Sequence, residues 1–352
     1  MAILGGRSNY PYLCARVKSK KSFLLKKEVF HRMLSMELAE IGRYLGETQY
    51  RDEIAALGTE YSGATLIEMG ISQNLAKTYT DVLSFSIGHA RELVSEYLHR
   101  WDIYNIKTVI RGKVTKASLE EIREILVPAG SLKLDQVNQL VQSSTWEELI
   151  DKLRRQKVIY VDEETLRNAV STGKLAAFED ELDKEYYSSM LKSIEEKSMS
   201  ERQFLDFVKR EIDIANLKAM FKLKSEGVSG ESLSQYFIPG GMEFKMERLA
   251  KMALLEGTKE LLDEFRQSSY AEMMRPDIEQ FERDEDTSSL LRALDRVLLY
   301  TAEKFSHLYP LSVLPVLGYL LAKKTEVDNI RIIARGKESG LDPELIKKLL
   351  VV

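Results

Sequence analysis

The sequence has little of what most catalytic and metal sites require. Cys14 is the only cysteine among 352 residues, which excludes an internal disulfide and a cysteine-based zinc site and is typical of a reducing cytoplasm. The four histidines have no metal-ligand spacing, and the sequence contains no phosphate loop, dinucleotide fingerprint or G-x-S-x-G nucleophile elbow. We therefore expect no catalytic residues, no metal and no cofactor.

The chain also lacks a charge excess of one sign and a long apolar run. Its 51 basic and 55 acidic residues nearly balance, whereas a general nucleic-acid binder would be strongly basic. Residues 1–20 contain no secretory signal. The most lipid-like run, Leu311 to Ala322, is interrupted by Pro315 and Gly318 and is too short to span a bilayer. We expect a buried helix there, no transmembrane segment and no nucleic-acid partner.

Proline is scarce, and this favours long helices. Only 7 prolines occur in 352 residues, a length that suggests two or three domains. Apolar residues recur at steps of three and four from Tyr79 to Trp101 and from Leu290 to Thr301, which predicts helices with one buried face. Alternation with period two is rare, although short strands near Val158 to Val161 are not excluded. The sequence therefore predicts an all-α fold.

What is present is a segment repeated three times. Asp102 to Lys113, Asp213 to Lys224 and Glu326 to Lys337 share an acid, an asparagine three residues later and a pair of cations. The asparagine stands at 105, 216 and 329, at intervals of 111 and 113. Such spacing is typical of an internal triplication. We predict three similar helical domains, residues 1–125, 126–237 and 238–352.

A proline turn accompanies the first two copies. Val127-Pro128-Ala129-Gly130 follows the first and Ile238-Pro239-Gly240-Gly241 the second, with 23 residues from asparagine to proline in both. Proline ends a helix, and glycine adopts backbone angles that other residues avoid. The third copy would need its proline at position 352, where the chain ends, so we expect it to lack this turn.

The spacing within each copy predicts two helix faces. At 100° per residue, Ile103, Ile106 and Ile110 form one apolar stripe, and equivalent residues do so in the other copies. The acid and the asparagine lie on the other side. If buried, they must be satisfied by hydrogen bonds, which would fix one packing register.

Each copy also places two cations four residues apart, where like charges repel by a few tenths of a kcal/mol. Either carboxylates from another helix of the protein pair with these cations, or a partner does. The second alternative makes them candidate partner-contact residues. The six are Lys107, Arg111, Lys218, Lys222, Arg331 and Arg335.

The segment from Trp101 to Lys113 resembles the signature of the C subunit of archaeal and bacterial A-type ATP synthases, a family that includes the d subunit of eukaryotic vacuolar ATPases. The turn from Leu126 to Gly130, the Asn9 to Tyr12 region and the length are similar as well. The second copy departs from the pattern, because Leu223 replaces the glycine of the other two.

The resemblance implies a funnel-shaped, all-α protein of three helical domains around a pseudo-threefold axis. It implies a peripheral, non-catalytic component, one copy per complex, on the cytoplasmic face of the cell membrane. There it would link the central stalk to the proteolipid ring and couple ATP synthesis to proton or sodium transport, with catalysis in other subunits. The six cations would then contribute to the stalk- or ring-facing surface.

Two other functions remain open from the residues alone. One is a helical adaptor in an unrelated soluble complex. The other is an all-α enzyme with dispersed carboxylates, although the acidic stretch Glu179 to Asp183 is more typical of a solvated helix face. Co-purification with a membrane rotary complex would separate the first from the family function, and a turnover or metal assay would reveal the second.

Overall fold

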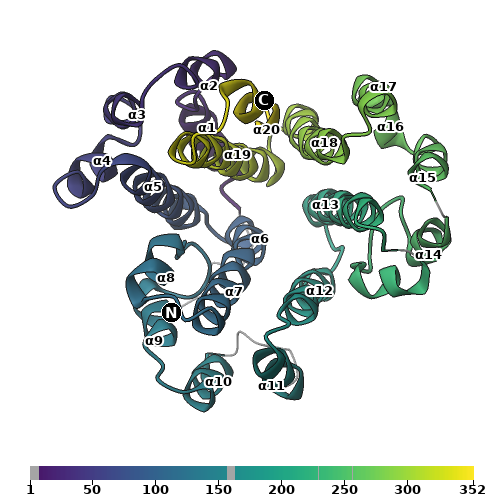
Figure 1. Ribbon diagram of the computed structural model, residues 1–352, viewed down its shortest axis with the longest axis horizontal. Helices are drawn as coiled ribbons and strands as arrows, with labels where there is room; N and C mark the ends of the chain where they lie inside the picture. The colour runs from purple at the N-terminus through teal and green to yellow at the C-terminus, as the bar shows by residue number, and fades with distance from the viewer. Residues whose placement is uncertain (1–7, 157–162, 229, 256) are drawn as a thin grey trace. The chain divides into compact units, whose positions relative to one another are not determined.

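The computed structural model describes residues 8–156, 163–228, 230–255 and 257–352. Within these ranges all regular structure is helical, so the predicted all-α class is confirmed (Figure 1). The possible strand near Val158 to Val161 lies outside the described residues. The chain forms two compact units, each built from two stretches of sequence: unit 1 is Met1–Tyr186 with Tyr319–Lys347, and unit 2 is Tyr187–Gly318 with Lys348–Val352. The predicted domain boundaries at 125 and 237 stay predictions.

Unit 1 begins with short helices that lead to the long helix α5 and the first motif helix, α7. Its helices are α1 Tyr10–Lys21, α2 Lys27–Met33, α3 Leu38–Leu45, α4 Arg51–Leu57, α5 Gly63–Phe85, α6 His89–Leu98, α7 Arg100–Val114, α8 Leu119–Ile125, α9 Leu134–Val141, α10 Trp146–Arg155, α11 Glu163–Thr172, most of α12 Ala176–Ser193, most of α19 Leu314–Glu338 and most of α20 Pro343–Leu349.

Unit 2 contains the second motif helix, α13, which packs along α18. Its elements are the end of α12, α13 Met199–Ser225, the 3-10 helix η1 Gly230–Tyr236, α14 Met246–Leu254, α15 Thr258–Phe265, α16 Ser269–Met273, α17 Arg275–Asp284, α18 Thr287–Leu308, the start of α19 and the end of α20.

Local sequence sets where several of these helices begin. Ser118 accepts a hydrogen bond from the Glu121 amide at 3.2 Å, while Glu121 accepts one from the Ser118 amide at 2.7 Å. Thr145 and Asp286 also accept bonds from first-turn amides, at the starts of α10 and α18. Each such cap contributes about 1 kcal/mol by satisfying donors that the helix cannot use itself.

The predicted apolar stripe of the motif is buried in all three copies. The nine residues are Ile103, Ile106, Ile110, Ile214, Leu217, Phe221, Val327, Ile330 and Ala334. Of the run from Leu311 to Ala322, expected to be a buried helix, residues 313–321 are buried, but Leu311 is exposed and α19 begins only at Leu314. Pro315 stands in the first turn of α19, where a missing amide hydrogen costs nothing. The three motif helices therefore form part of the core of their units.

Candidate functional site

The asparagine of the motif binds the backbone N–H and C=O of one residue in the proline turn. Asn105 Nδ2 donates to the Val127 carbonyl at 2.8 Å, and Asn105 Oδ1 accepts from the Val127 amide at 2.8 Å. Asn216 makes the same two bonds to Ile238, at 2.8 and 2.7 Å. Each bonded residue precedes a proline, which favours the extended backbone that exposes both groups to the amide. The predicted internal role of this asparagine is confirmed in the first two copies.

The acid of the motif binds the same turn a few residues later. Asp102 accepts hydrogen bonds from the Ser131 amide at 2.8 Å, the Ser131 hydroxyl at 2.8 Å and the Leu132 amide at 2.9 Å. A Cβ on Gly130 would lie 2.2 Å from Asp102 Oδ1. Glycine is therefore required because the carboxylate needs the space that a side chain would fill.

Asp213 repeats this arrangement in unit 2. It accepts from the Glu243 amide at 2.8 Å, the Phe244 amide at 3.1 Å and the Tyr270 hydroxyl at 2.8 Å. A Cβ on Gly241 would again lie 2.2 Å from the carboxylate. Burial raises the pKa of Asp213, although the hydrogen bonds oppose this shift.

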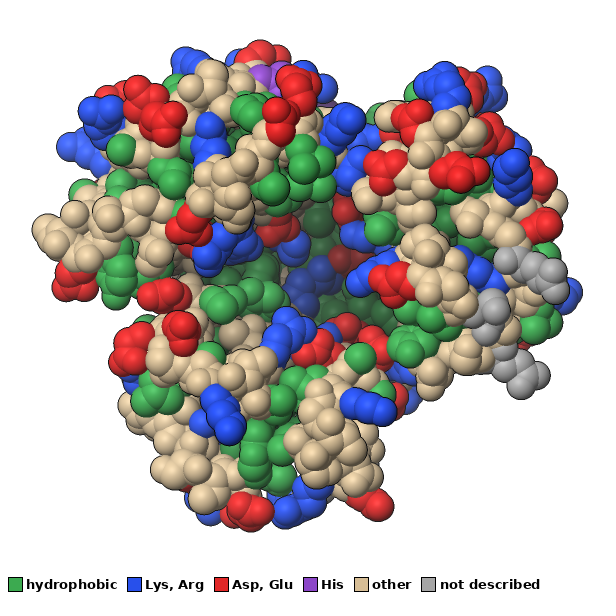
Figure 2. Space-filling view, viewed as in Figure 1, with side chains coloured by type: hydrophobic (Ala, Val, Ile, Leu, Met, Phe, Trp, Pro, Cys, Tyr) green, Lys and Arg blue, Asp and Glu red, His purple; other side chains and the backbone are tan. Residues whose placement is uncertain are grey.

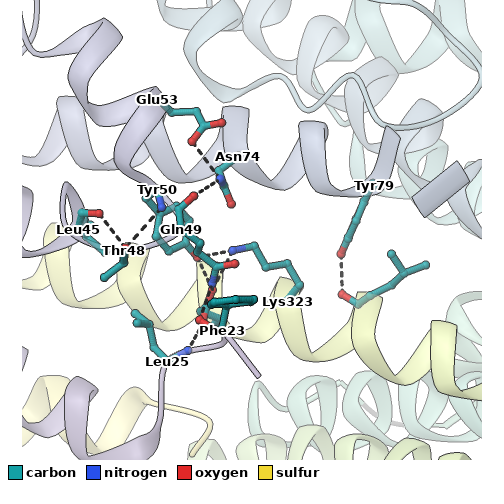
Figure 3. A network of polar contacts seen from close by, with 12 residues as sticks. Phe23, Leu25, Leu45, Thr48, Gln49, Tyr50, Glu53, Asn74, Tyr79 and Lys323 are labelled. Carbon is teal, nitrogen blue, oxygen red and sulfur yellow. Dashed lines mark hydrogen bonds and ion pairs between the residues drawn. The ribbon is translucent and has the colours of Figure 1, made fainter. Parts of the chain in front are cut away.

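In the third copy the N-terminal segment makes the contacts that a proline turn makes in the other two. Glu326 accepts from the Leu25 amide, from Gln49 Nε2 at 2.8 Å and from the Tyr50 hydroxyl at 2.5 Å. Lys323 Nζ lies 2.8 Å from Glu326 Oε1 and 2.8 Å from the Tyr50 hydroxyl oxygen. Figure 3 shows Gln49, Tyr50 and Lys323 converging beside the Phe23 to Leu25 segment.

This buried ionic cluster was not predicted from the sequence. Lys323 is 0% exposed, and burial lowers its pKa while the neighbouring Glu326 carboxylate raises it. Burial also raises the pKa of Tyr50, and the Glu326 charge adds to that shift. Because Lys323 lies outside the repeated segment and its partners stand far away in sequence, only the three-residue spacing to Glu326 could have indicated it.

A second missed contact is made by the lysine eight residues after each asparagine. Lys113 donates to the carbonyls of Val141 at 2.9 Å and Ser143 at 2.6 Å, at the end of α9. Lys224 donates to the Ala253 carbonyl at 2.7 Å, and Lys337 donates to the Leu34 carbonyl at 2.7 Å. A cation at a helix C-terminus satisfies carbonyls that lack a partner within the helix and complements its dipole. The recurrence of lysine at this spacing was the available signal.

The glycine that the second copy lacks has a packing role in the other two. A Cβ on Gly112 would lie 2.5 Å from Ile122 of α8, and one on Gly336 would lie 2.7 Å from Ile346 of α20. In the second copy the motif helix is followed by the 3-10 helix η1 instead of an α-helix. Leu223 therefore marks a difference in the element that follows α13.

The paired cations of the first copy face carboxylates on a neighbouring antiparallel helix. Lys107 lies 2.5 Å from Asp183, and Arg111 forms two bonds to Glu179, at 2.6 and 3.2 Å, both on α12. In the third copy Arg335 binds Glu68 of α5, with Nε 2.6 Å from the carboxylate. Arg331 donates to Ser72 Oγ at 3.0 Å and lies 3.2 Å from Asp328.

The second copy has the same register but only one ion pair. Lys218 forms bonds of 2.7 and 2.8 Å to Asp295 of α18. One turn before Asp295 stands Leu291, where the register of the other copies would place a partner for Lys222. Lys222 is exposed and makes no ion pair or side-chain hydrogen bond with the described residues. Carboxylates of another helix thus pair with four of the six cations, while Arg331 pairs with Asp328 of its own helix.

Residues 13–349 match the family model of the ATP synthase (C/AC39) subunit. The chain belongs to the ATP synthase (C/AC39) subunit family. This member is 37% identical to the C subunit of the A-type ATP synthase of Methanosarcina acetivorans, over 99% of this chain and 94% of that protein. It is 34% identical to the Haloferax volcanii protein of the same name over the whole of both chains, and 36% identical to that of Archaeoglobus fulgidus over 100% and 99%.

The described residues of this C/AC39 family member were searched for membrane-spanning helices and for metal-binding groups. Among the described residues, no helix combines the length and apolar character needed to cross a bilayer. Within the same ranges, no three His, Cys, Asp or Glu side chains are grouped so as to hold a metal ion. Acidic and basic side chains are interspersed over the face shown in Figure 2. The chemistry that the structure does display is that of buried anchors and ion pairs between helices.

Proposed function

We propose that this chain is a non-catalytic part of a rotary A-type ATP synthase, where it links the central shaft to the membrane proteolipid ring. Relatives named as C subunits of A-type ATP synthases match it over nearly their whole length. The chain would lie peripherally on the cytoplasmic face of the cell membrane, one copy per complex. Its function would be mechanical coupling of ATP synthesis to proton or sodium transport.

The observation that carries the proposal is the anchoring of each motif helix. Its acid and its final lysine are bonded to neighbouring segments in all three copies, and the asparagine is bonded in the first two. Close-packed interiors are poorly compressible, and satisfied polar networks fix one packing register. A part that transmits torque needs this resistance to sliding between helices.

The six cations remain candidates for the partner-facing surface. Arg111 and Arg335 keep 61% and 56% of their side chains exposed although they are paired internally, so they could also bind carboxylates of a partner. Lys222 has the strongest claim, because its charge is not compensated within the described residues and Leu291 stands where a carboxylate would neutralise it.

The proposal can be tested by purification from native membranes. A tagged chain should retain the catalytic subunits and the proteolipid ring after mild detergent extraction. A complex assembled without the chain should hydrolyse ATP without pumping ions, and adding the purified chain should restore pumping. Recovery of soluble partners alone would favour the helical adaptor and overturn the proposal.

The surface role of the cations has a matched test. Lys222→Glu should weaken recovery of partners more than Lys222→Gln does, because it introduces repulsion as well as removing a charge. Leu291→Glu should also weaken recovery of partners, but less, since its carboxylate would form an ion pair with Lys222. If all three variants fold, as judged by circular dichroism, and assemble normally, Lys222 makes no partner contact.

A further inference from the structure

Unit 1 contains a cavity that none of the contacts above explains. Its volume is about 280 Å³, near the lower end of the range for small-molecule sites. It lies between α7 and α19, with Asp183 of α12 at its edge. Four cations and two carboxylates line it: Arg100, Lys107, Lys324, Arg331, Asp183 and Asp328.

The cavity has more positive charge than its own carboxylates neutralise. Lys107 pairs with Asp183 at 2.5 Å. Lys324 and Arg331 share one carboxylate, that of Asp328, at 2.5 and 3.2 Å. Counting all six groups, the lining carries a net charge of +2, since four cations face two carboxylates. An anion that enters the cavity would gain attraction from several cations at once.

One wall of the cavity is aromatic. The rings of Trp101 and Tyr104 meet edge to face, with centroids 5.3 Å apart. Trp101 is only 5% exposed, and its indole Nε1–H is buried without an acceptor among the described residues. Both rings line the cavity, so a planar group that enters it can pack against them.

We propose that this cavity binds a small phosphate monoester that carries a planar ring. The dianionic phosphate matches the net charge and supplies several acceptors for Lys107, Lys324 and Arg331. The ring packs against the wall formed by Trp101 and Tyr104. All of the residues that line this site belong to unit 1.

The purified full-length chain allows a direct binding experiment. The sequence has two tryptophans, Trp101 and Trp146, so a Trp146→Phe background makes fluorescence report on the cavity alone. The probes are phenyl phosphate and a nucleoside monophosphate, which distinguish a simple ring from a nucleoside as the ring-bearing part. Inorganic phosphate, which lacks the ring, and benzyl alcohol, which lacks the phosphate, are the two half-probes. Calorimetry gives an independent affinity.

We expect phenyl phosphate or the nucleotide to bind saturably and about tenfold more tightly than either half-probe. The affinity should fall as salt rises, because screening weakens the attraction. Binding of inorganic phosphate as tight as that of the ring-bearing probes would overturn the proposal, because the aromatic wall would then contribute nothing. Absence of saturation by every probe would overturn it too.

Variants give the sign of each contribution. Lys324→Gln should weaken binding about threefold to tenfold, whereas Asp328→Asn should strengthen it, since it removes a carboxylate that competes for two cations. Tyr104→Leu removes one ring of the aromatic wall, and it should weaken binding of the ring-bearing probes in calorimetry. Lys218→Gln is the matched control: it removes the cation equivalent to Lys107 outside the cavity and should leave the affinity for phenyl phosphate unchanged. Equal affinity in Lys324→Gln and Asp328→Asn would contradict the site.

Discussion

Asp213 in unit 2 and Glu326 in unit 1 stand at the same position of the motif, but different groups neutralise them. Asp213 accepts hydrogen bonds from two backbone amides and a tyrosine hydroxyl, and all three donors lie within 57 residues of it in the sequence. Glu326 accepts one backbone amide from 301 residues away and pairs with the buried ammonium of Lys323. The longer side chain and the cation replace what a local turn provides in the second copy. A carboxylate with few backbone donors thus needs a buried counter-charge.

The strongest test of this comparison is removal of the counter-charge. Lys323→Met leaves Glu326 buried and uncompensated, so we expect the free energy of unfolding of unit 1 to fall by about 3–5 kcal/mol. Both tryptophans belong to unit 1, and their fluorescence during urea unfolding reports on that unit. The double variant Lys323→Met, Glu326→Gln should recover most of the loss. A single variant as stable as the wild type would show that the pair contributes nothing.

The thiol of Cys14 in α1 offers a second measurement on the same variant. Burial raises the pKa of Cys14 to about 11, so alkylation at pH 8 should be about 100-fold slower than in the unfolded chain. Lys323→Met should accelerate alkylation by loosening the N-terminal segment that Glu326 holds. Asn216→Ala, which acts in unit 2, should leave the rate unchanged. Equal acceleration of Cys14 alkylation by Lys323→Met and Asn216→Ala would show that the Glu326 contacts do not act on the N-terminal segment specifically.

Next in size is the loss of the asparagine that both proline turns share. Asn105→Ala and Asn216→Ala each leave one buried amide and one buried carbonyl without a partner, at a cost of about 2–4 kcal/mol. Tryptophan fluorescence should detect the lower stability of Asn105→Ala, because both tryptophans lie in unit 1. Circular dichroism should detect the earlier unfolding of unit 2 in Asn216→Ala. Asn168→Ala on the exposed face of α11 is the control and should cost less than about 0.5 kcal/mol. Unequal losses at 105 and 216 would show that the copies are not equivalent.

The raised pKa of Asp213 predicts that the stability of unit 2 depends on pH. Because the folded state binds the proton more tightly than the unfolded state, stability from this group is greatest at low pH and is lost as pH rises through the raised pKa. The stability advantage of wild type over Asp213→Asn should therefore shrink as the pH rises above the ordinary pKa of an aspartate carboxyl. Urea unfolding followed by circular dichroism measures it, and an advantage that grows with pH would contradict the assignment.

The smallest effect belongs to the ion pairs between antiparallel helices. Leu291→Glu should add the pair that the second copy lacks and stabilise unit 2 by about 0.3–0.5 kcal/mol, since such pairs are half exposed. Glu179→Leu makes the reverse change in the first copy and should destabilise unit 1 by a similar amount. Thermal unfolding at low and high salt measures both. Effects that do not diminish with salt would have another cause.

How much the sequence could reveal depended on whether an interaction was local. The apolar stripe was predictable at Ile103, Ile106 and Ile110, because helix geometry fixes which residues share a face. The sequence predicted that Asn105 forms hydrogen bonds within the protein, but not that its partner is Val127. That partner depends on how the chain turns back after α7. Pairing of Lys107 and Arg111 with carboxylates was one of two alternatives, and only tertiary packing selects Asp183 and Glu179.

The Lys323 cluster lay beyond sequence reasoning for a different reason. No proline turn follows the third copy in the sequence, but nothing local indicated that Leu25 replaces it. Likewise, the lysine at the end of each motif was visible as a repeat, while its acceptors at the ends of α9, α14 and α2 depend on long-range packing. Distance along the chain separates what could be predicted from what could not.

The bond from Leu25 to Glu326 has a consequence for synthesis on the ribosome. The first helices of unit 1 are made before unit 2, whereas α19, which Leu25 contacts, is completed after nearly all of unit 2. Contacts that close such long loops form slowly, and apolar surface exposed in the meantime is prone to aggregation. The first helices of the nascent chain therefore remain without their α19 contacts until nearly all of unit 2 has been synthesised. A prematurely terminated product would lack α19 altogether.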